Sequence, residues 1–241
     1  MADNIKACIQ SGVPEIKKGS RAGQRLAVVG GGPSVLEHLD ELFGWDGEVW
    51  AINGAASLMR RENILHYAFS VDPNPGLENY LAGSERAILA SCCRKEIFDC
   101  FKDRVEMFHL DTFGGKGLRA SGGATTASRA HMVAIWCGFE EVHYFGCEGC
   151  VPLEGDTHAY MNNPDVDAVI IKAGDKTFKA HADHVMQSQC LSDVIREFPV
   201  YFKNRSGGLL QGMIDNKDTW EMTGLSHSLM KTIGAFDNVH A

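Results

Sequence analysis

A glycine-rich segment early in the chain has the residue types expected of a phosphate-binding loop. It is Gly30-Gly31-Gly32-Pro33-Ser34, placed between a short apolar run and an amphipathic helical pattern. Glycines allow a sharp turn and leave backbone N–H groups exposed at the start of the next helix, where a phosphate is stabilised. It lacks both the lysine of a Walker A loop and the third glycine of a dinucleotide fingerprint. We therefore expect contact with a nucleotide or its phosphates; a tight strand–helix turn capped by Ser34 is the alternative.

A second glycine-rich segment precedes the strong helical pattern of residues 124–137. The segment is Ser121-Gly122-Gly123-Ala124-Thr125-Thr126. Its hydroxyl and N–H groups suit a second phosphate or a ribose. Helix capping is the alternative, and the two roles are compatible.

Asp72 and Asn53 each end an apolar run. Pro73 and Pro75 follow Asp72 and keep the next backbone out of a helix. A carboxylate at such a position can hold Mg²⁺ or act as a base, and a capping or turn role is the alternative. Asn53 can hydrogen-bond a base, a ribose or a phosphate, or start the next helix as a turn residue.

The segment 147–165 lacks periodicity, which is typical of a functional loop or lid. Within it, Glu148 is the expected partner of Asp72 in holding a metal, and His158 is an acid–base candidate. Surface acids on a lid are the alternative. We expect His181 and His184, farther along, to cap a helix or face solvent.

The elements that must position these residues alternate along the chain. Short apolar runs predict strands over 26–30, 48–53, 66–72, 86–92, 104–110 and 141–146. Helical patterns separate several of them, as at 35–43 and 124–137. The alternation predicts an α/β, Rossmann-like, doubly wound and mostly parallel sheet of about six or seven strands in three α/β/α layers. In such a sheet the ligand lies outside the carboxyl ends of the strands, where the residues above fall.

Beyond residue 165 the pattern is looser. A hairpin-like turn at Gly174-Asp175, a helix over 181–198 and a short strand over 199–204 are predicted. We divide the chain into an N-terminal arm or short leading helix (1–25), a Rossmann-like domain (26–204) and a C-terminal extension (205–241).

The composition excludes several classes of protein. The chain has 241 residues, 44% of them hydrophobic, and a net charge of −8. This argues against a disordered chain and against a basic nucleic-acid binder. No window approaches the ~20 apolar residues of a membrane span, and no secretory leader precedes residue 25, so a cytoplasmic protein with reduced thiols is expected. The single C-x-x-C of Cys147 and Cys150 lacks the second pair of a structural zinc site.

Four segments in order resemble the MptE-like family. They are VVGGGPS, AINGAA, SVDP and SGGATTASRAHMVAIWCGFEEVHYFGCEG, within residues 26–158. The family is named for an archaeal 6-hydroxymethyl-7,8-dihydropterin diphosphokinase and includes bacterial and phage relatives and flagellin-glycosylation accessory proteins. Its fold is similar to that of bacterial sialyltransferases, which use a CMP-activated sugar. The resemblance implies that the two glycine segments, Asn53 and Asp72 share one nucleotide cleft. Where the family strand ends in aspartate, this chain has Glu148.

These observations predict a nucleotide-dependent transferase. The leading version is a diphosphokinase, with ATP at the glycine loops and Mg²⁺ at Asp72 and Glu148. The alternatives are a glycosyltransferase that uses a nucleotide sugar, with His158 or Asp72 as base, and a non-catalytic nucleotide-binding protein. The expected partners are a small-molecule nucleotide and an acceptor, not a nucleic acid; a homo-oligomer is left open.

Overall fold

The structure is a computed structural model that describes residues 2–110, 125–151, 159, 168–198, 201–216 and 219–225. Four predicted site residues, Ser121, Gly122, Gly123 and His158, lie outside the described residues.

The larger sheet contains seven strands in the order β5-β4-β3-β2-β1-β6-β9, and every neighbouring pair is parallel. The strands are β1 (Arg25–Val29), β2 (Glu48–Ile52), β3 (Tyr67–Ser70), β4 (Arg86–Ala90), β5 (Val105–Phe108), β6 (Glu141–Phe145) and β9 (Tyr201–Asn204). The predicted Rossmann-like α/β fold is confirmed.

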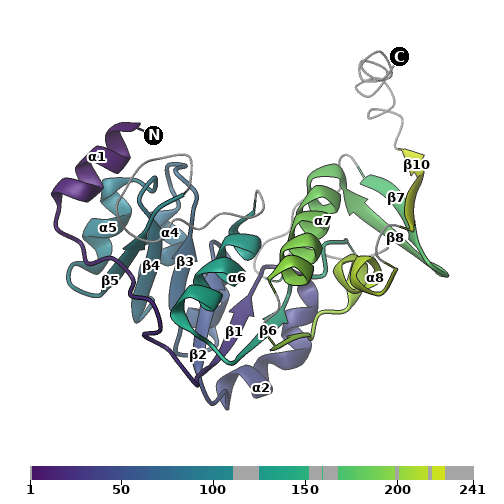
Figure 1. The fold of residues 1–241 in the computed structure, drawn as a ribbon, viewed down its shortest axis with the longest axis horizontal. Helices are drawn as coiled ribbons and strands as arrows, with labels where there is room; N and C mark the ends of the chain where they lie inside the picture. Colours follow the sequence, from purple (N-terminus) through teal and green to yellow (C-terminus); the bar gives the residue numbers. More distant parts are fainter. Residues whose placement is uncertain are drawn as a thin grey trace.

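The central strands are covered on both faces. In β1, all four residues from Leu26 to Val29 are fully buried, although successive side chains of a strand point to opposite faces. Helices therefore pack on both sides, and Figure 1 shows α6 crossing in front of the sheet. The helices of this part are α1 (Ala2–Gln10), the 3₁₀ helix η1 (Pro33–His38), α2 (Leu39–Phe43), α3 (Ala55–Arg61), α4 (Glu78–Leu81), α5 (Lys95–Phe101) and α6 (Thr126–Cys137).

A smaller antiparallel sheet follows, in the order β10-β7-β8. It contains β7 (Ala168–Ala173), β8 (Lys176–His181) and β10 (Trp220–Leu225), with helices α7 (Ala182–Glu197) and α8 (Gly208–Asn216) beside it (Figure 1). The predicted hairpin at Gly174-Asp175 and the helix after it are confirmed. Strand β10 and helix α8 were not predicted from the sequence. Leu209 and Met213 of α8 pack with Val169 and Ile171 of β7.

The N-terminal segment lies along the outer edge of β5. Ile16 N donates to Met107 O (2.9 Å), and Met107 N donates to Pro14 O (2.9 Å). Further on, Arg21 is 7% exposed and forms ion pairs with Glu48 and Glu106. The segment thus covers an edge that would otherwise present unpaired backbone groups.

The strand order reverses next to β1. Strands β1 to β5 follow one another outward on one side, and β6 then returns to the other side of β1. In an open α/β sheet such a reversal leaves a crevice at the carboxyl ends of the two central strands. Here that crevice lies between the segments that follow β1 and β6.

Across the described residues, no helix has the length and apolar character to cross a bilayer.

Candidate functional site

A cleft of about 610 Å³ opens at the carboxyl ends of the strands. The predicted site residues among its lining are Gly30, Gly31, Gly32, Asn53, Asp72, Thr125, Thr126 and Glu148. Residues from five separate parts of the sequence are therefore brought to one cavity. Pro33 and Ser34 begin η1 beside it and do not line it.

The first glycine loop packs tightly against the loop after β6. Gly30 N donates to Phe145 O and Gly32 N donates to Gly146 O, both at 2.8 Å. A Cβ placed on Gly30 would lie 2.4 Å from Gly146 O. Gly146 itself has φ of 62°, a conformation that favours glycine. Close contact between two backbones is thus one reason for glycine here, independent of any ligand.

Glu148 places its carboxylate against this glycine loop. Its Oε1 accepts a hydrogen bond from Ser34 N (2.7 Å), while its Oε2 is buried and has no hydrogen-bond partner among the described residues. A Cβ on Gly32 would lie 1.7 Å from Oε2. The Ser34 N–H, which was predicted to meet a phosphate, therefore donates to the protein's own carboxylate.

Asn53 links two neighbouring elements at the floor of the cleft. Its Oδ1 accepts from Ser70 Oγ (2.8 Å), and its Nδ2 donates to Thr126 Oγ1 (3.4 Å). Asn53 has φ of 46°, in the left-handed region that asparagine tolerates better than most residues. Its backbone N–H donates to Phe69 O. Asn53 thus fixes the end of β3 relative to the start of α6.

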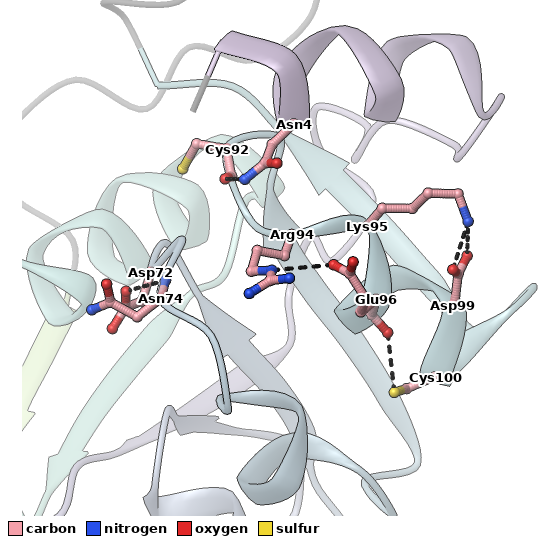
Figure 2. A network of polar contacts seen from close by, with 9 residues as sticks. All are labelled: Asn4, Asp72, Asn74, Cys92, Arg94, Lys95, Glu96, Asp99 and Cys100. Carbon is pink, nitrogen blue, oxygen red and sulfur yellow. Dashed lines mark hydrogen bonds and ion pairs between the residues drawn. The ribbon is translucent and has the colours of Figure 1, made fainter.

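Asp72 lies two residues beyond β3. Its Oδ1 accepts from Asn74 N (2.9 Å), the turn predicted as the alternative role, and Figure 2 shows this pair near Cys92. Its backbone N donates to Ser70 Oγ (3.1 Å). Asp72 nevertheless lines the cleft and is half-buried. The turn and a role toward a ligand are therefore compatible.

Helix α6 begins at the cleft wall. Thr125 Oγ1 accepts from Ser128 N (3.1 Å), and Ser128 Oγ accepts from Thr125 N (3.2 Å), so the predicted cap is present as a reciprocal capping box. Thr125, Thr126 and Ala127 line the cleft. The positive end of a twelve-residue helix thus faces it. No lysine or arginine is among the described residues of the lining.

Helix α7 supplies a wall of the cleft that was not predicted from the sequence. His184, Gln187, Ser188 and Leu191 line the cleft, on one helical face. We expected His184 to cap the helix or face solvent; it is half-buried in the first turn of α7 and lines the cleft. The spacing of these four residues was visible in the sequence, but a helical face carries no indication of which cavity it borders.

The cleft cysteines are poor nucleophiles. Burial raises the pKa of the Cys147 thiol to about 12, and burial likewise raises the pKa of Cys150. All eight cysteines are free thiols. The described residues contain no group of three or more His, Cys, Asp or Glu side chains that could hold a metal ion, so the predicted Mg²⁺ site at Asp72 and Glu148 gains no support.

Comparison with known proteins shows the fold. No family model matches the chain, and no curated protein matches it either, so the MptE-like family is not supported. The structure of MAf glycosyltransferase from Magnetospirillum magneticum AMB-1 has a TM-score of 0.65 over 92% of this chain at 13% identity. A mammalian sialyltransferase in complex with Gal-beta-1-3GalNAc-ortho-nitrophenol has a TM-score of 0.40, covering 68% of this chain and 72% of its own at 14% identity.

The chain spans 43% of the length of the MAf structure. At 13% identity the likeness shows the fold alone. The chain therefore shares its Rossmann-like architecture with a glycosyltransferase.

Proposed function

We propose that this chain is a nucleotide-dependent transferase, and that it transfers a glycosyl group from a nucleotide sugar to a hydroxyl acceptor. The observation that carries the proposal is the cleft at the strand-order reversal, with the amino end of α6 in its wall. A volume of about 610 Å³ is within the usual range for small-molecule sites. The fold shared with MAf glycosyltransferase supports this version over the diphosphokinase.

The charges of the cleft favour a donor with little phosphate charge. Its described lining contains the acids Asp72 and Glu148 and no lysine or arginine. One helix end and a few backbone N–H groups do not offset the negative charge of a triphosphate. Mg²⁺ or cationic side chains would be needed as well. A sugar nucleotide with one phosphate, such as a CMP-sugar, fits better, with its phosphate at the start of α6.

Asp72 is the proposed base. The acceptor's hydroxyl oxygen attacks the anomeric carbon of the donor, and the bond from that carbon to the phosphate oxygen breaks. The nucleoside phosphate leaves with the electron pair, and Asp72 takes the hydroxyl proton. The Asn74 N–H on Oδ1 orients the carboxylate for this role.

A ligand panel tests the function. Thermal unfolding is followed with CMP, CMP-sugars, other nucleotide sugars and ATP, each with Mg²⁺ or with a chelator. A CMP-sugar is expected to raise the midpoint in both conditions, since binding at 100 Kd adds about 2.7 kcal/mol of stability. If none of the nucleotides raises the midpoint, the proposal is wrong; if only ATP with Mg²⁺ does, the diphosphokinase version replaces it.

The substitution Asp72→Asn tests the role of the base. It keeps the size of the side chain and the acceptor for Asn74 N, but it removes the basic oxygen. We expect transfer to fall about 10²- to 10⁴-fold with donor affinity unchanged. Asp46→Asn, at an exposed aspartate outside the cleft, is the matched control. Normal turnover in Asp72→Asn would remove Asp72 from the mechanism.

A further inference from the structure

Glu148 is held firmly in the wall of the cleft. It is 7% exposed, and its backbone carbonyl accepts from Leu210 N (3.0 Å) near the start of α8. A Cβ on Gly208 would lie 2.6 Å from Glu148 Cβ. The stem of the side chain therefore has α8 on one side and the glycine loop on the other.

The two carboxylate oxygens have different surroundings. Oε1 accepts from Ser34 N at 2.7 Å, the length of a charge-assisted hydrogen bond. Oε2 packs over Gly32 and has no hydrogen-bond partner among the described residues. A buried carboxylate oxygen without a donor is unfavourable. Capping of η1 accounts for Oε1 and leaves Oε2 unexplained.

A ligand's phosphate at this loop would compete with that carboxylate. The loop turns a backbone N–H toward one anion, and that anion is already the side chain of Glu148. Lysine and arginine are absent from the described lining, so two negative groups here would repel with little compensation.

We infer that Glu148 is a specificity-determining residue: the negative charge of its carboxylate, held beside the glycine loop, excludes a phosphate from that loop. The inference rests on the proposed function and deepens it. Ligands that place an uncharged part, such as a base or a sugar, against Gly32 are accepted. Ligands that need a second phosphate at this loop are rejected.

The test compares the wild type with Glu148→Gln, which keeps the shape and removes the charge. Calorimetric titrations use three probes: inorganic pyrophosphate, CDP and the uncharged nucleoside cytidine. We expect Glu148→Gln to bind pyrophosphate and CDP at least about tenfold more tightly than the wild type, with cytidine affinity unchanged. Glu197→Gln, at an exposed glutamate at the end of α7, is the control and shows no change.

Each outcome separates this inference from the proposed function. If Glu148→Gln leaves pyrophosphate and CDP affinities unchanged or weakens them, the inference is wrong while nucleotide binding stands. If neither pyrophosphate nor any nucleotide of the ligand panel binds the wild type or the variant, the proposed function fails and the inference with it. Should Glu148→Gln not fold, Glu148→Asp gives the same ranking, since the shorter side chain withdraws the charge from Ser34 N; its gain is smaller than that of the neutral variant, and the absence of any gain overturns the inference.

Discussion

At the scale of single residues, the wall of the cleft at the glycine loop is so closely packed that it has no room for a larger side chain. Gly32 has φ of −69°, which alanine also adopts, so its requirement for glycine comes from its neighbour and not from its backbone. That neighbour is Glu148, whose Oε2 would lie 1.7 Å from a Cβ on Gly32. The glycine and the glutamate therefore form one unit, although 116 positions separate them in the chain.

The substitution Gly32→Ala tests this unit. We expect it to lower the free energy of unfolding by about 1–3 kcal/mol, because the new methyl group overlaps the carboxylate. In the background of Glu148→Ala the same change costs at least about 1 kcal/mol less, since the overlap is gone. Urea unfolding of the four proteins gives the coupling.

Gly44→Ala is the matched control for this cycle. The nearest atom to its Cβ is Asp40 O at 3.6 Å, an ordinary contact, so little destabilisation is expected. An equal cost of Gly32→Ala in both backgrounds would show that the two residues do not interact.

A buried histidine makes stability depend on pH. Burial lowers the pKa of His131 to about 4, from an ordinary value near 6.5. Its Nε2–H donates to Phe198 O (3.2 Å), which leaves Nδ1 to accept from Tyr144 Oη (2.6 Å) in the neutral ring. Between those two pH values the unfolded chain binds the proton and the native protein does not. Stability is therefore complete above about pH 6.5 and decreases as the pH falls toward 4.

The expected loss from this histidine is about 3 kcal/mol across that interval. Urea unfolding at a series of pH values measures it. In His131→Gln, which does not titrate, the decline becomes shallower by that amount. Parallel curves for the two proteins would contradict the assignment.

At the scale of elements, described segments before and after the predicted Rossmann-like domain contribute to the fold. Arg21 pairs with Glu48 (3.2 Å) and Glu106, so it ties the N-terminal segment to β2 and β5. On the other side of the molecule, Ser206 Oγ accepts from Cys147 N (2.8 Å) and Leu210 lines the cleft. Residues on both sides of the predicted Rossmann-like domain therefore contact its strands or the segments that follow them.

Replacing Arg21 with methionine leaves two partly buried carboxylates without their cation. We expect a loss of about 3 kcal/mol in the free energy of unfolding, because breaking one partner of a buried ion pair strands the other charges. Arg61→Met is the control, since the Arg61–Glu62 pair is exposed and such pairs contribute little. Equal midpoints for Arg21→Met and the wild type in thermal unfolding would disprove the role.

Ending the chain after Asn204 tests the contribution of α8 and β10. The shortened chain loses Leu209 and Met213 from the smaller core and the Leu210 N–H that binds Glu148 O. We expect loss of nucleotide binding and faster proteolysis within β7 and β8. Binding at the affinity of the full chain would show that the cleft forms without these elements.

Strands β1 to β6 were predictable because each is a short, mostly apolar run ended by glycine, proline or a polar residue, and the hairpin was predictable from its turn residues Gly174 and Asp175. The carboxyl-edge rule also brought Asn53, Asp72 and Glu148 to one cavity. The place of Glu148's carboxylate was not predictable, since it depends on how two loops pack backbone to backbone. Strand β10 was not predictable either, because the local sequence of a strand does not indicate which other strand it pairs with.

At the scale of the whole molecule, net charge opposes the proposed ligand. The chain carries −8, and the described cleft lining adds no lysine or arginine to offset it. An anionic nucleotide therefore approaches against the field of the protein, and the binding free energy must come from short-range contacts.

This predicts an unusual salt dependence. Raising NaCl from about 20 to about 200 mM should increase the association rate of CMP by about two- to threefold, because screening weakens the repulsion. The rate for uncharged cytidine should not change. Stopped-flow measurements with both ligands test this, and a rate for CMP that falls with salt would indicate attractive steering by cations near the cleft.

The position of β1 between β2 and β6 also has a consequence during synthesis of the chain. Arg25 of β1 pairs with Glu141 of β6, 116 residues later. At ribosomal rates of about 5–20 residues per second, β1 waits between about 6 and 23 s for that neighbour to be made. Until then the fully apolar segment Leu26–Val29 has an open side. We expect synonymous codons that slow translation before residue 141 to reduce the soluble yield of the protein, because they lengthen the interval in which this apolar segment is open.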